Sequence, residues 1–349
     1  MAPAITTPTA PADPTAAATV IDTRQAPASA VSLADVLDTV PGVQVRRFGG
    51  VGEYSTVSIR GYAPGAVQLY LDGVPLTRAQ NETVNLADLP LDAVDHVEVY
   101  RGTTPIGFLR SGPGGVVNIV TRRPGTTPLT AASAGYGSYS YRKLDAARAA
   151  SHGAWDYLAF AHYLGSEGNF PFVNDRGSTA GPGGLGDDVE QRRTNNAFDL
   201  VDGTFRLGWQ PLPAARLAFT NETFYRTGGL AGVGNRQTRR AHLSTLRELA
   251  HLDGTLVPSW SWPTTVDASA FSVLEESALR IPVDELGFGR SDQDTRTLST
   301  GGQMLARTQL GAHQLASVLL GGGHERFSSE DRFCLRSRPT RTRASVTVA

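Results

Sequence analysis

The sequence has one cysteine, Cys334, and one lysine, Lys143, among its 32 basic residues. A single thiol can form no internal disulfide and cannot supply a cysteine-based zinc or iron–sulfur site. Nowhere do 18 or more apolar residues follow one another, which excludes a membrane-spanning helix. The strands of a membrane-spanning β-barrel alternate and never form such runs, so a barrel is not excluded.

Charge of neither sign is in excess. The 32 basic and 33 acidic residues give a net charge of −1. A protein that holds a nucleic-acid backbone needs a concentrated positive face, so the balance argues against a nucleic-acid partner.

The sequence also lacks the motifs of common enzymes. The glycine-rich segment 112–115 lacks the G-x-G-x-x-G spacing and leads into a strand, whereas phosphate-binding loops open a helix. The sequence has no G-K-[ST], G-x-S-x-G or H-E-x-x-H, and its seven histidines include no i,i+4 pair. We therefore expect no enzyme activity, no catalytic residue, no cofactor and no metal site.

Residues 1–17 are almost all proline, alanine and threonine, which predicts a disordered leader. The leader lacks the positive start and the apolar stretch of a secretory signal. We expect either a true start farther upstream or a protein that is not exported by that route.

Residues 18–125 have the pattern of a small mixed α+β domain. Residues 32–40 predict an amphipathic helix with Ser32 as its N-cap and Asp35 completing a capping box. Asp72-Gly73 predicts a tight hairpin, because both residues accept positive φ. A short helix is expected over 86–94. Strands are expected at 19–22, 57–59, 68–71, 97–100 and 116–120.

The region 129–327 predicts roughly nine β-segments. They lie near 129–137, 139–150, 154–166, 194–210, 214–227, 243–257, 264–280, 294–309 and 313–327. In the fourth segment Val201, Phe205, Leu207 and Trp209 share one face, and Asp202, Thr204 and Arg206 share the other. Short and long connections alternate, as in an up-and-down outer-membrane barrel and unlike a soluble sandwich.

Five segments in order resemble the plug domain of TonB-dependent outer-membrane receptors. They are SLADVLDTVPGVQV (32–45), VSIRGY (57–62), VQLYLDGVPL (67–76), LPLDAVDHVEVYRG (89–102) and GPGGVVNIVT (112–121). The resemblance implies an α+β plug domain over 18–125, followed over 129–327 by an incomplete antiparallel transmembrane β-barrel, about nine strands of a 22-strand type.

The resemblance also implies a gated importer in the cell outer membrane. Its ligand would be scarce and bulky, such as an iron–siderophore complex or cobalamin. Its partners would be outer-membrane lipid and TonB, with ExbB and ExbD, acting on the N-terminal side.

For individual residues, the resemblance implies a lock between plug and barrel, and we expect Arg60, Glu98 and Arg101 to join it. The alternative is ordinary solvated charge at strand ends. The glycines and turn residues of the motifs are expected to supply special backbone conformations or local hydrogen bonds; they are Gly61, Asp72, Gly73, Gly102, Gly114, Gly115 and Asn118.

Loops 46–54 and 78–83 correspond to the loops that face ligand in the family. The candidate contacts in them are Arg46, Arg47, Phe48, Tyr54, Arg78 and Asn81. Aromatic and arginine side chains there could meet an anionic ligand.

The sequence departs from the family pattern in two respects. No TonB-contacting box is recognised, because residues 18–22 align with the first plug strand. A plugged lumen needs about 22 strands, whereas the pattern predicts about nine. Nine is also an odd number, and bacterial barrels have an even number of strands. Residues 328–349, with five arginines between 332 and 343, predict a basic disordered tail. These departures suggest a truncated or frameshifted reading frame.

Two functions therefore stay open. The first is an outer-membrane TonB-dependent receptor, or a fragment of one. The alternative is a truncated non-transporting product or a soluble plug-type binding or signalling module. An upstream start and an intact downstream frame would favour the transporter.

Overall fold

The computed structural model describes thirteen stretches of the chain. They are residues 18–25, 32–50, 52–78, 83–89, 91–102, 104–124, 128–174, 188–232, 234–259, 262–287, 289–310, 314–333 and 340–348. The expected disordered leader and the candidate Asn81 lie outside the described residues.

The N-terminal domain, residues 18–124, is a mixed α+β unit, as expected. Its five-stranded sheet has the order β1-β6-β7-β4-β5, in which β4 and β7 are parallel and the other pairs antiparallel. These strands are β1 (Ala18–Asp22), β4 (Gln68–Leu71), β5 (Val74–Pro75), β6 (Val94–Tyr100) and β7 (Val116–Thr121). A separate pair joins β2 (Val43–Arg47) to β3 (Ser55–Ile59).

The predicted helix forms at its N-terminal end. Helix α1 spans Leu33–Leu37, and the Ser32 amide donates to Asp35 Oδ2 over 2.9 Å, as the capping box predicts. Residues 38–40 continue as turns, because the residue before Pro41 is disfavoured in the α region. The stripe at helical spacing is buried in the core of the domain; it consists of Leu33, Val36, Leu37 and Val40.

The Asp72-Gly73 hairpin is confirmed. Both residues have positive φ, 49° and 80°. The Asp72 carboxylate also accepts hydrogen bonds from the amide and hydroxyl of Thr121, and the Gly73 amide donates to Asn118 Oδ1 over 3.1 Å. The turn is therefore tied to β7 by side chains as well as by its own backbone.

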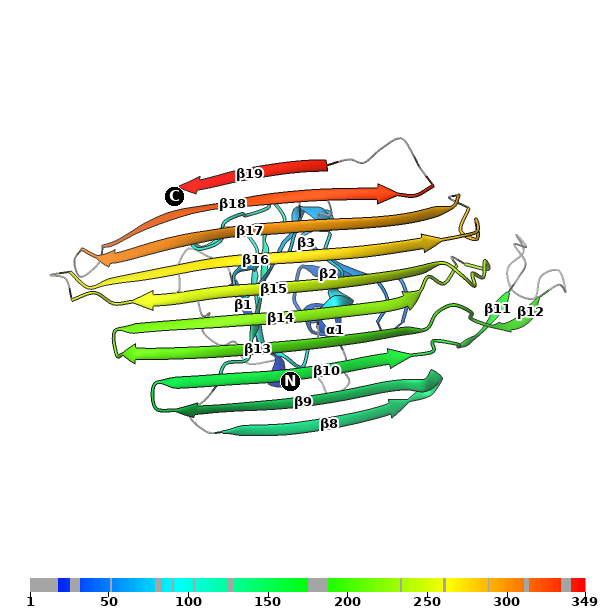
Figure 1. Cartoon of the computed structure of the whole chain (residues 1–349), viewed down its shortest axis with the longest axis horizontal. Coiled ribbons are helices and arrows are strands. Elements are labelled where there is room, and N and C mark those ends of the chain that lie inside the picture. The colour runs from blue at the N-terminus through cyan, green and yellow to red at the C-terminus, as the bar shows by residue number, and fades with distance from the viewer. Residues whose placement is uncertain are drawn as a thin grey trace.

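A second sheet contains ten antiparallel strands in chain order (Figure 1). They are β8 (Leu129–Gly137), β9 (Tyr141–His152), β10 (Trp155–Ser166), β13 (Phe198–Leu212), β14 (Ala215–Gly229), β15 (His242–Leu256), β16 (Thr264–Ile281), β17 (Ser291–Gln309), β18 (Leu315–Asp331) and β19 (Thr340–Val348). The first nine match the nine predicted segments. Because β8 and β19 are the two edges, the sheet does not close within the described residues.

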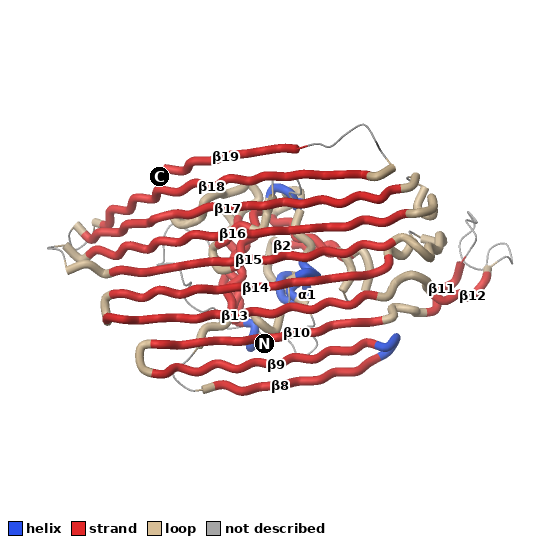
Figure 2. The backbone as a smooth tube through the Cα atoms, in the orientation of Figure 1, coloured by secondary structure: helices blue, strands red, loops and turns tan. Residues whose placement is uncertain are grey.

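The connections between strands differ at the two ends of the sheet. Short turns at 153–154 and 213–214 lie at one end, and the longer connections 167–197 and 230–241 lie at the other (Figures 1 and 2). The predicted alternation is therefore present. The longest connection carries a small hairpin of its own, β11 (Pro171–Asn174) with β12 (Val189–Arg192).

Three expectations are wrong in detail. The region expected as a basic tail contains the end of β18 and all of β19, which pairs with β18 along residues 340–348. The helix expected over 86–94 is a single turn, η3 (Leu86–Asp88). Arg46 and Arg47 lie in strand β2 rather than in a loop.

The N-terminal domain lies behind the middle of the ten-stranded sheet (Figure 1). Its hydrophobic core extends into that sheet, because Leu249 of β15 and Phe271 and Val273 of β16 pack in the same buried cluster. Within the described residues no helix has the length and apolar composition needed to cross a membrane.

We expect Gly115→Ala to weaken the N-terminal domain by about 2 kcal/mol or more. Gly115 has φ +97°, and a Cβ there would lie 2.2 Å from the carbonyl oxygen of Tyr100. The loss can be measured as faster hydrogen exchange of the β6 and β7 amides. Gly61→Ala is the matched control, since φ is +78° but a Cβ would meet nothing within 4 Å. Equal losses in both variants would contradict the clash.

Candidate functional site

The two faces of the ten-stranded sheet differ in chemistry. In β13 the side chains of Val201, Phe205 and Trp209 point outward and are 50%, 43% and 38% exposed. Asp202, Thr204 and Arg206 point to the N-terminal domain and are at most 5% exposed. The predicted alternation is confirmed, with apolar side chains on the outer face and charged ones on the inner face.

Arginines of the inner face reach the N-terminal domain at Asp88. Arg226 of β14 lies 3.1 Å from the Asp88 carboxylate, and Arg247 of β15 donates to the Asp88 carbonyl oxygen over 3.0 Å. Arg247 also pairs with Glu222 of β14 over 2.8 Å, and both side chains are almost fully buried. One turn of the domain is therefore held by two neighbouring strands.

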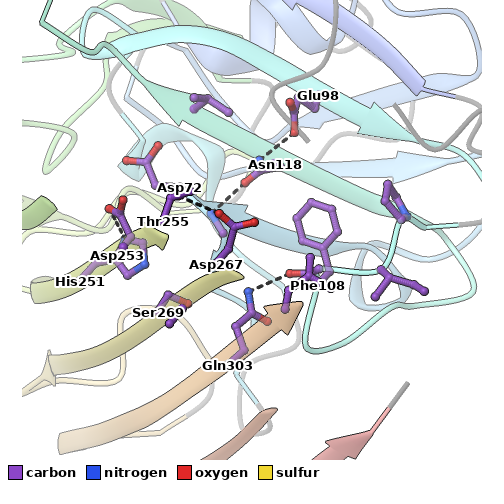
Figure 3. Close-up of a pocket in the computed structure, with 18 of the residues that line it drawn as sticks. Asp72, Glu98, Phe108, Asn118, His251, Asp253, Thr255, Asp267, Ser269 and Gln303 are labelled. Carbon is purple, nitrogen blue, oxygen red and sulfur yellow. Dashed lines mark hydrogen bonds and ion pairs between the residues drawn. The ribbon is translucent and has the colours of Figure 1, made fainter. Parts of the chain in front are cut away.

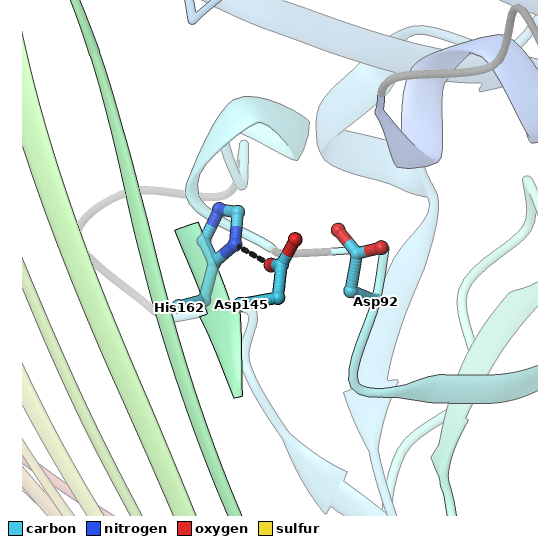
Figure 4. A group of neighbouring side chains, drawn as sticks. All are labelled: Asp92, Asp145 and His162. Atoms are coloured by element: carbon cyan, nitrogen blue, oxygen red, sulfur yellow. Dashed lines mark hydrogen bonds and ion pairs between the residues drawn. The ribbon is translucent and has the colours of Figure 1, made fainter. Parts of the chain in front are cut away.

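A second contact of this kind involves the only lysine. Lys143 Nζ of β9 lies 2.5 Å from Asp92 of the domain and 3.5 Å from Asp145 of its own strand. Asp145 in turn lies 2.6 Å from His162 Nδ1 of β10 (Figure 4).

Asp92, Asp145 and His162 also have the ligand types of a metal site. Their ligand atoms lie within 4.8 Å of one another. The Lys143 ammonium already supplies positive charge to both carboxylates, and Ser133 donates to Asp145 over 2.6 Å. The arrangement is therefore that of a salt-bridge network joining domain and sheet.

Inside the domain a buried network surrounds Glu98. Asn118 Nδ2 donates to Glu98 over 2.9 Å, and the Tyr100 hydroxyl donates to it over 3.2 Å. His96 Nε2 lies 3.5 Å from the same carboxylate and its Nδ1 lies 2.9 Å from Asp95. Burial opposes protonation of His96, but Glu98 and Asp95 outweigh it and raise the pKa of the imidazole.

The three residues expected in the lock have different surroundings. Glu98 is buried in the network just described. Arg101 donates to the carbonyl oxygen of Pro41 over 2.6 Å and to Thr19 over 2.5 Å, both within the domain. Arg60 is exposed and has positive φ, 51°. No hydrogen bond or ion pair among the described residues joins these three side chains to one another, and their role in a lock stays a prediction.

The remaining motif glycines fall into two groups. Gly61, Gly102 and Gly115 have positive φ. Gly114 owes its place to close approach, because a Cβ there would lie 2.9 Å from the carbonyl oxygen of Ala66.

The residues predicted to contact ligand lie in different environments. Phe48 and Tyr54 are 56% and 40% exposed, with ring centroids 5.5 Å apart, and the Arg46 guanidinium lies 4.9 Å from the Phe48 centroid. Arg47 pairs with Asp35 and Asp38 of the domain, both over 3.0 Å. Arg78 is buried instead of facing a loop surface.

The tip of the loop between β2 and β3 also contacts the sheet. Gly52 leaves room for the Phe198 ring of β13, because a Cβ there would lie 2.2 Å from that ring. Burial raises the pKa of Glu53, and Arg226 and Arg193 partly offset this effect. This loop therefore adds a contact at the end of the sheet that carries the long connections.

A cavity of about 310 Å³ separates domain and sheet near the short turns (Figure 3). The domain contributes Asp72, Glu98 and Asn118 to its wall, and the sheet contributes acidic and basic side chains from β13, β15, β16 and β17. Gln303 of β17 crosses to the domain and donates to the carbonyl oxygen of Gly107 over 2.9 Å. This part of the interface is thus polar and leaves space between domain and sheet.

Comparison with known proteins agrees with this architecture. A family model described as the TonB-dependent receptor plug domain matches residues 10–116. The vitamin B12 transporter BtuB of Vibrio cholerae serotype O1 is 32% identical over 146 residues, which cover 40% of this chain and 24% of that protein.

Solved structures are similar over nearly the whole chain. The ferric yersiniabactin uptake receptor FyuA of Yersinia pestis has a TM-score of 0.68 at 17% identity, covering 95% of this chain and 52% of FyuA. The copper transporter OprC has a TM-score of 0.69 at 14% identity, covering 93% of this chain and 48% of OprC. The chain spans about half the length of these solved proteins.

We expect Arg247→Met to destabilise the interface by about 3 kcal/mol, because it leaves the buried Glu222 carboxylate without its partner. The double variant Arg247→Met/Glu222→Gln should recover part of this loss. Thermal unfolding in detergent, followed by circular dichroism, measures both. Arg296→Met is the control, since its pair with Glu276 is exposed and worth at most about 1 kcal/mol. A similar loss in the control would argue against a special role for the buried pair.

We expect the domain to be more stable below about pH 6.5 than above it, through His96. A raised folded-state pKa means that this contribution is complete below the unfolded-state pKa and is lost as the pH rises through the folded-state pKa. Hydrogen exchange of β6 amides, corrected for intrinsic rates, should show more protection at about pH 6 than at about pH 8. His96→Gln should reduce this difference, and an unchanged difference would exclude His96 as its source.

Proposed function

We propose that this chain serves in the uptake of a scarce, bulky ligand across the outer membrane, because residues 10–116 match the TonB-dependent receptor plug domain and its sheet has the fold of a solved uptake receptor. The ligand class is an iron–siderophore complex or cobalamin. The step is transport, with no covalent chemistry on the ligand.

One observation carries this proposal: in β13 the charged side chains of Asp202 and Arg206 face a plug-like domain, while the side chains along the middle of its outer face are apolar. Val201, Phe205 and Trp209 on the outer face suit contact with lipid chains. Asp202 and Arg206 on the inner face suit a polar lumen. A protein with water on both sides of this sheet would have no reason to sort its side chains in this way.

The partners follow from the same premise. TonB, with ExbB and ExbD, would supply energy from the inner membrane through the N-terminal side of the domain, and outer-membrane lipid would surround the sheet. A pull on the N-terminal side would have to break the ion pairs at Asp88 and Asp92, which hold the domain to the sheet.

The ligand would enter from the end with the long connections. Phe48, Tyr54 and Arg46 lie in or beside a loop at that end, and their aromatic and cationic groups suit a large anionic chelate. BtuB is named a vitamin B12 transporter and FyuA a ferric yersiniabactin uptake receptor, which supports the same classes of ligand for this chain.

We expect Phe205→Arg to reduce the amount of folded chain in the outer membrane. A charge at the middle of a lipid-facing strand costs about 2 to 4 kcal/mol. The measurement is membrane fractionation of cells that express the chain, combined with heat-modifiable gel mobility.

Leu212→Arg is the matched control, because Leu212 is an exposed apolar residue at the end of the same strand, where the cost is at most about 1 kcal/mol. If Phe205→Arg leaves folding unchanged or increases the yield of soluble protein, the outer face contacts water and the membrane proposal fails.

A further inference from the structure

A second cavity, of about 320 Å³, lies between the domain and the last strands of the sheet. Three arginines line it: Arg78 and Arg110 from the domain and Arg343 from β19. Thr77 and Ser111 add hydroxyl groups to the wall. Neither carboxylate that lies near these arginines, Glu275 or Glu325, lines this cavity.

Arg78 is the most unusual of the three. The residue is only 4% exposed, and Nη1 donates to the carbonyl oxygen of Pro75 over 2.6 Å. Its Nε and Nη2 are buried and have no hydrogen-bond partner among the described residues. A buried guanidinium with two unsatisfied donors is costly unless an acceptor occupies the adjoining space.

The surrounding charges leave the cavity positive. Arg110 is 4.0 Å from Glu325, which is a loose contact for an ion pair. Burial lowers the pKa of Arg78, and the neighbouring Arg247 and Arg110 act in the same direction, whereas Glu275 and Glu325 oppose them. Three guanidinium groups thus face a space that contains hydroxyl groups and no carboxylate.

We propose that this cavity binds a compact oxyanion, a phosphate or a carboxylate group, between Arg78, Arg110 and Arg343. The planar fork of arginine donates two parallel hydrogen bonds to such a group, and several forks around one anion provide charge as well as geometry. Thr77 or Ser111 can add a neutral donor. The anion would satisfy the two free donors of Arg78 and join the domain to β19.

The cavity contains no residue of loop 46–54 and is independent of the proposed transport. Arg78 follows β5, and Arg343 pairs across from Glu325 in the middle of β18. The anion can therefore be a small solute or an acidic group of a larger molecule. Free inorganic phosphate and free succinate, used as separate probes, distinguish phosphate from carboxylate preference.

The test is calorimetric titration of the detergent-purified chain with inorganic phosphate at low ionic strength. We expect saturable binding, and a Kd that rises about tenfold or more in Arg78→Gln and in Arg110→Gln, because each change removes charge-assisted hydrogen bonds. Arg296→Gln removes one positive charge on the outer face of the sheet and should leave the Kd unchanged. Arg78→Lys should bind with intermediate affinity, since it keeps the charge and loses the fork.

Thermal unfolding provides a second measurement that separates binding from folding. Phosphate should raise the unfolding temperature of the unaltered chain and of Arg296→Gln, but not that of Arg78→Gln. Without phosphate, Arg78→Gln should unfold at the same temperature as the unaltered chain or higher, because two of its three nitrogens have no partner to lose. Absence of saturable binding, or equal weakening in Arg78→Gln and Arg296→Gln, would overturn the proposal. These measurements do not involve uptake, so a failure of the transport proposal would not be confused with a failure of this one.

Discussion

Charged side chains on the inner face of the ten-stranded sheet need partners, and this constraint decides how sheet and domain fit together. Arg206, Glu222 and Arg247 are each at most 4% exposed. A buried charge is tolerated only when it is paired or hydrogen-bonded. Part of that pairing occurs within the sheet, as between Arg247 and Glu222, and part comes from the domain at Asp88 and Asp92.

The interface between domain and sheet has an apolar part and a part held by ion pairs. Leu249, Phe271 and Val273 of the sheet join the hydrophobic core of the domain, which fixes the domain near the centre of the sheet. Around this centre the contacts are polar, and cavities remain on both sides. A domain attached in this way has an apolar contact at its centre and, around it, polar contacts of a kind that water can replace. That combination agrees with the role proposed above.

Local signals in the sequence predicted the elements well where the chemistry is local. Asp72-Gly73 forms its turn because both residues tolerate positive φ, and Ser32 caps its helix through Asp35 three residues later. The alternation of β13 predicted which side chains face outward, because successive side chains of a strand point to opposite faces. Strand β19 was missed because five arginines in one stretch obscured its β-branched alternation. The edge of β18 supplies the pairing that this segment lacks by itself.

The contacts between domain and sheet were not predicted, and the reason is the distance along the chain. Arg226 and Asp88 are 138 residues apart, and Lys143 and Asp92 are 51 residues apart. The single lysine, Lys143, and the acidic residue Asp92 could both be recognised in the sequence. No local pattern indicated that they pair with each other. The three arginines around the second cavity are equally scattered along the chain, and the family pattern predicts a ligand-facing loop for Arg78.

The sequence by itself determined the plug-like motifs, nine of the ten strands and the face to which each β13 side chain belongs, because these depend on neighbours along the chain. Only the tertiary structure decided which charges meet across the interface, which arginine is left with free donors and where space remains, because those outcomes depend on the stacking of two sheets that no local pattern encodes.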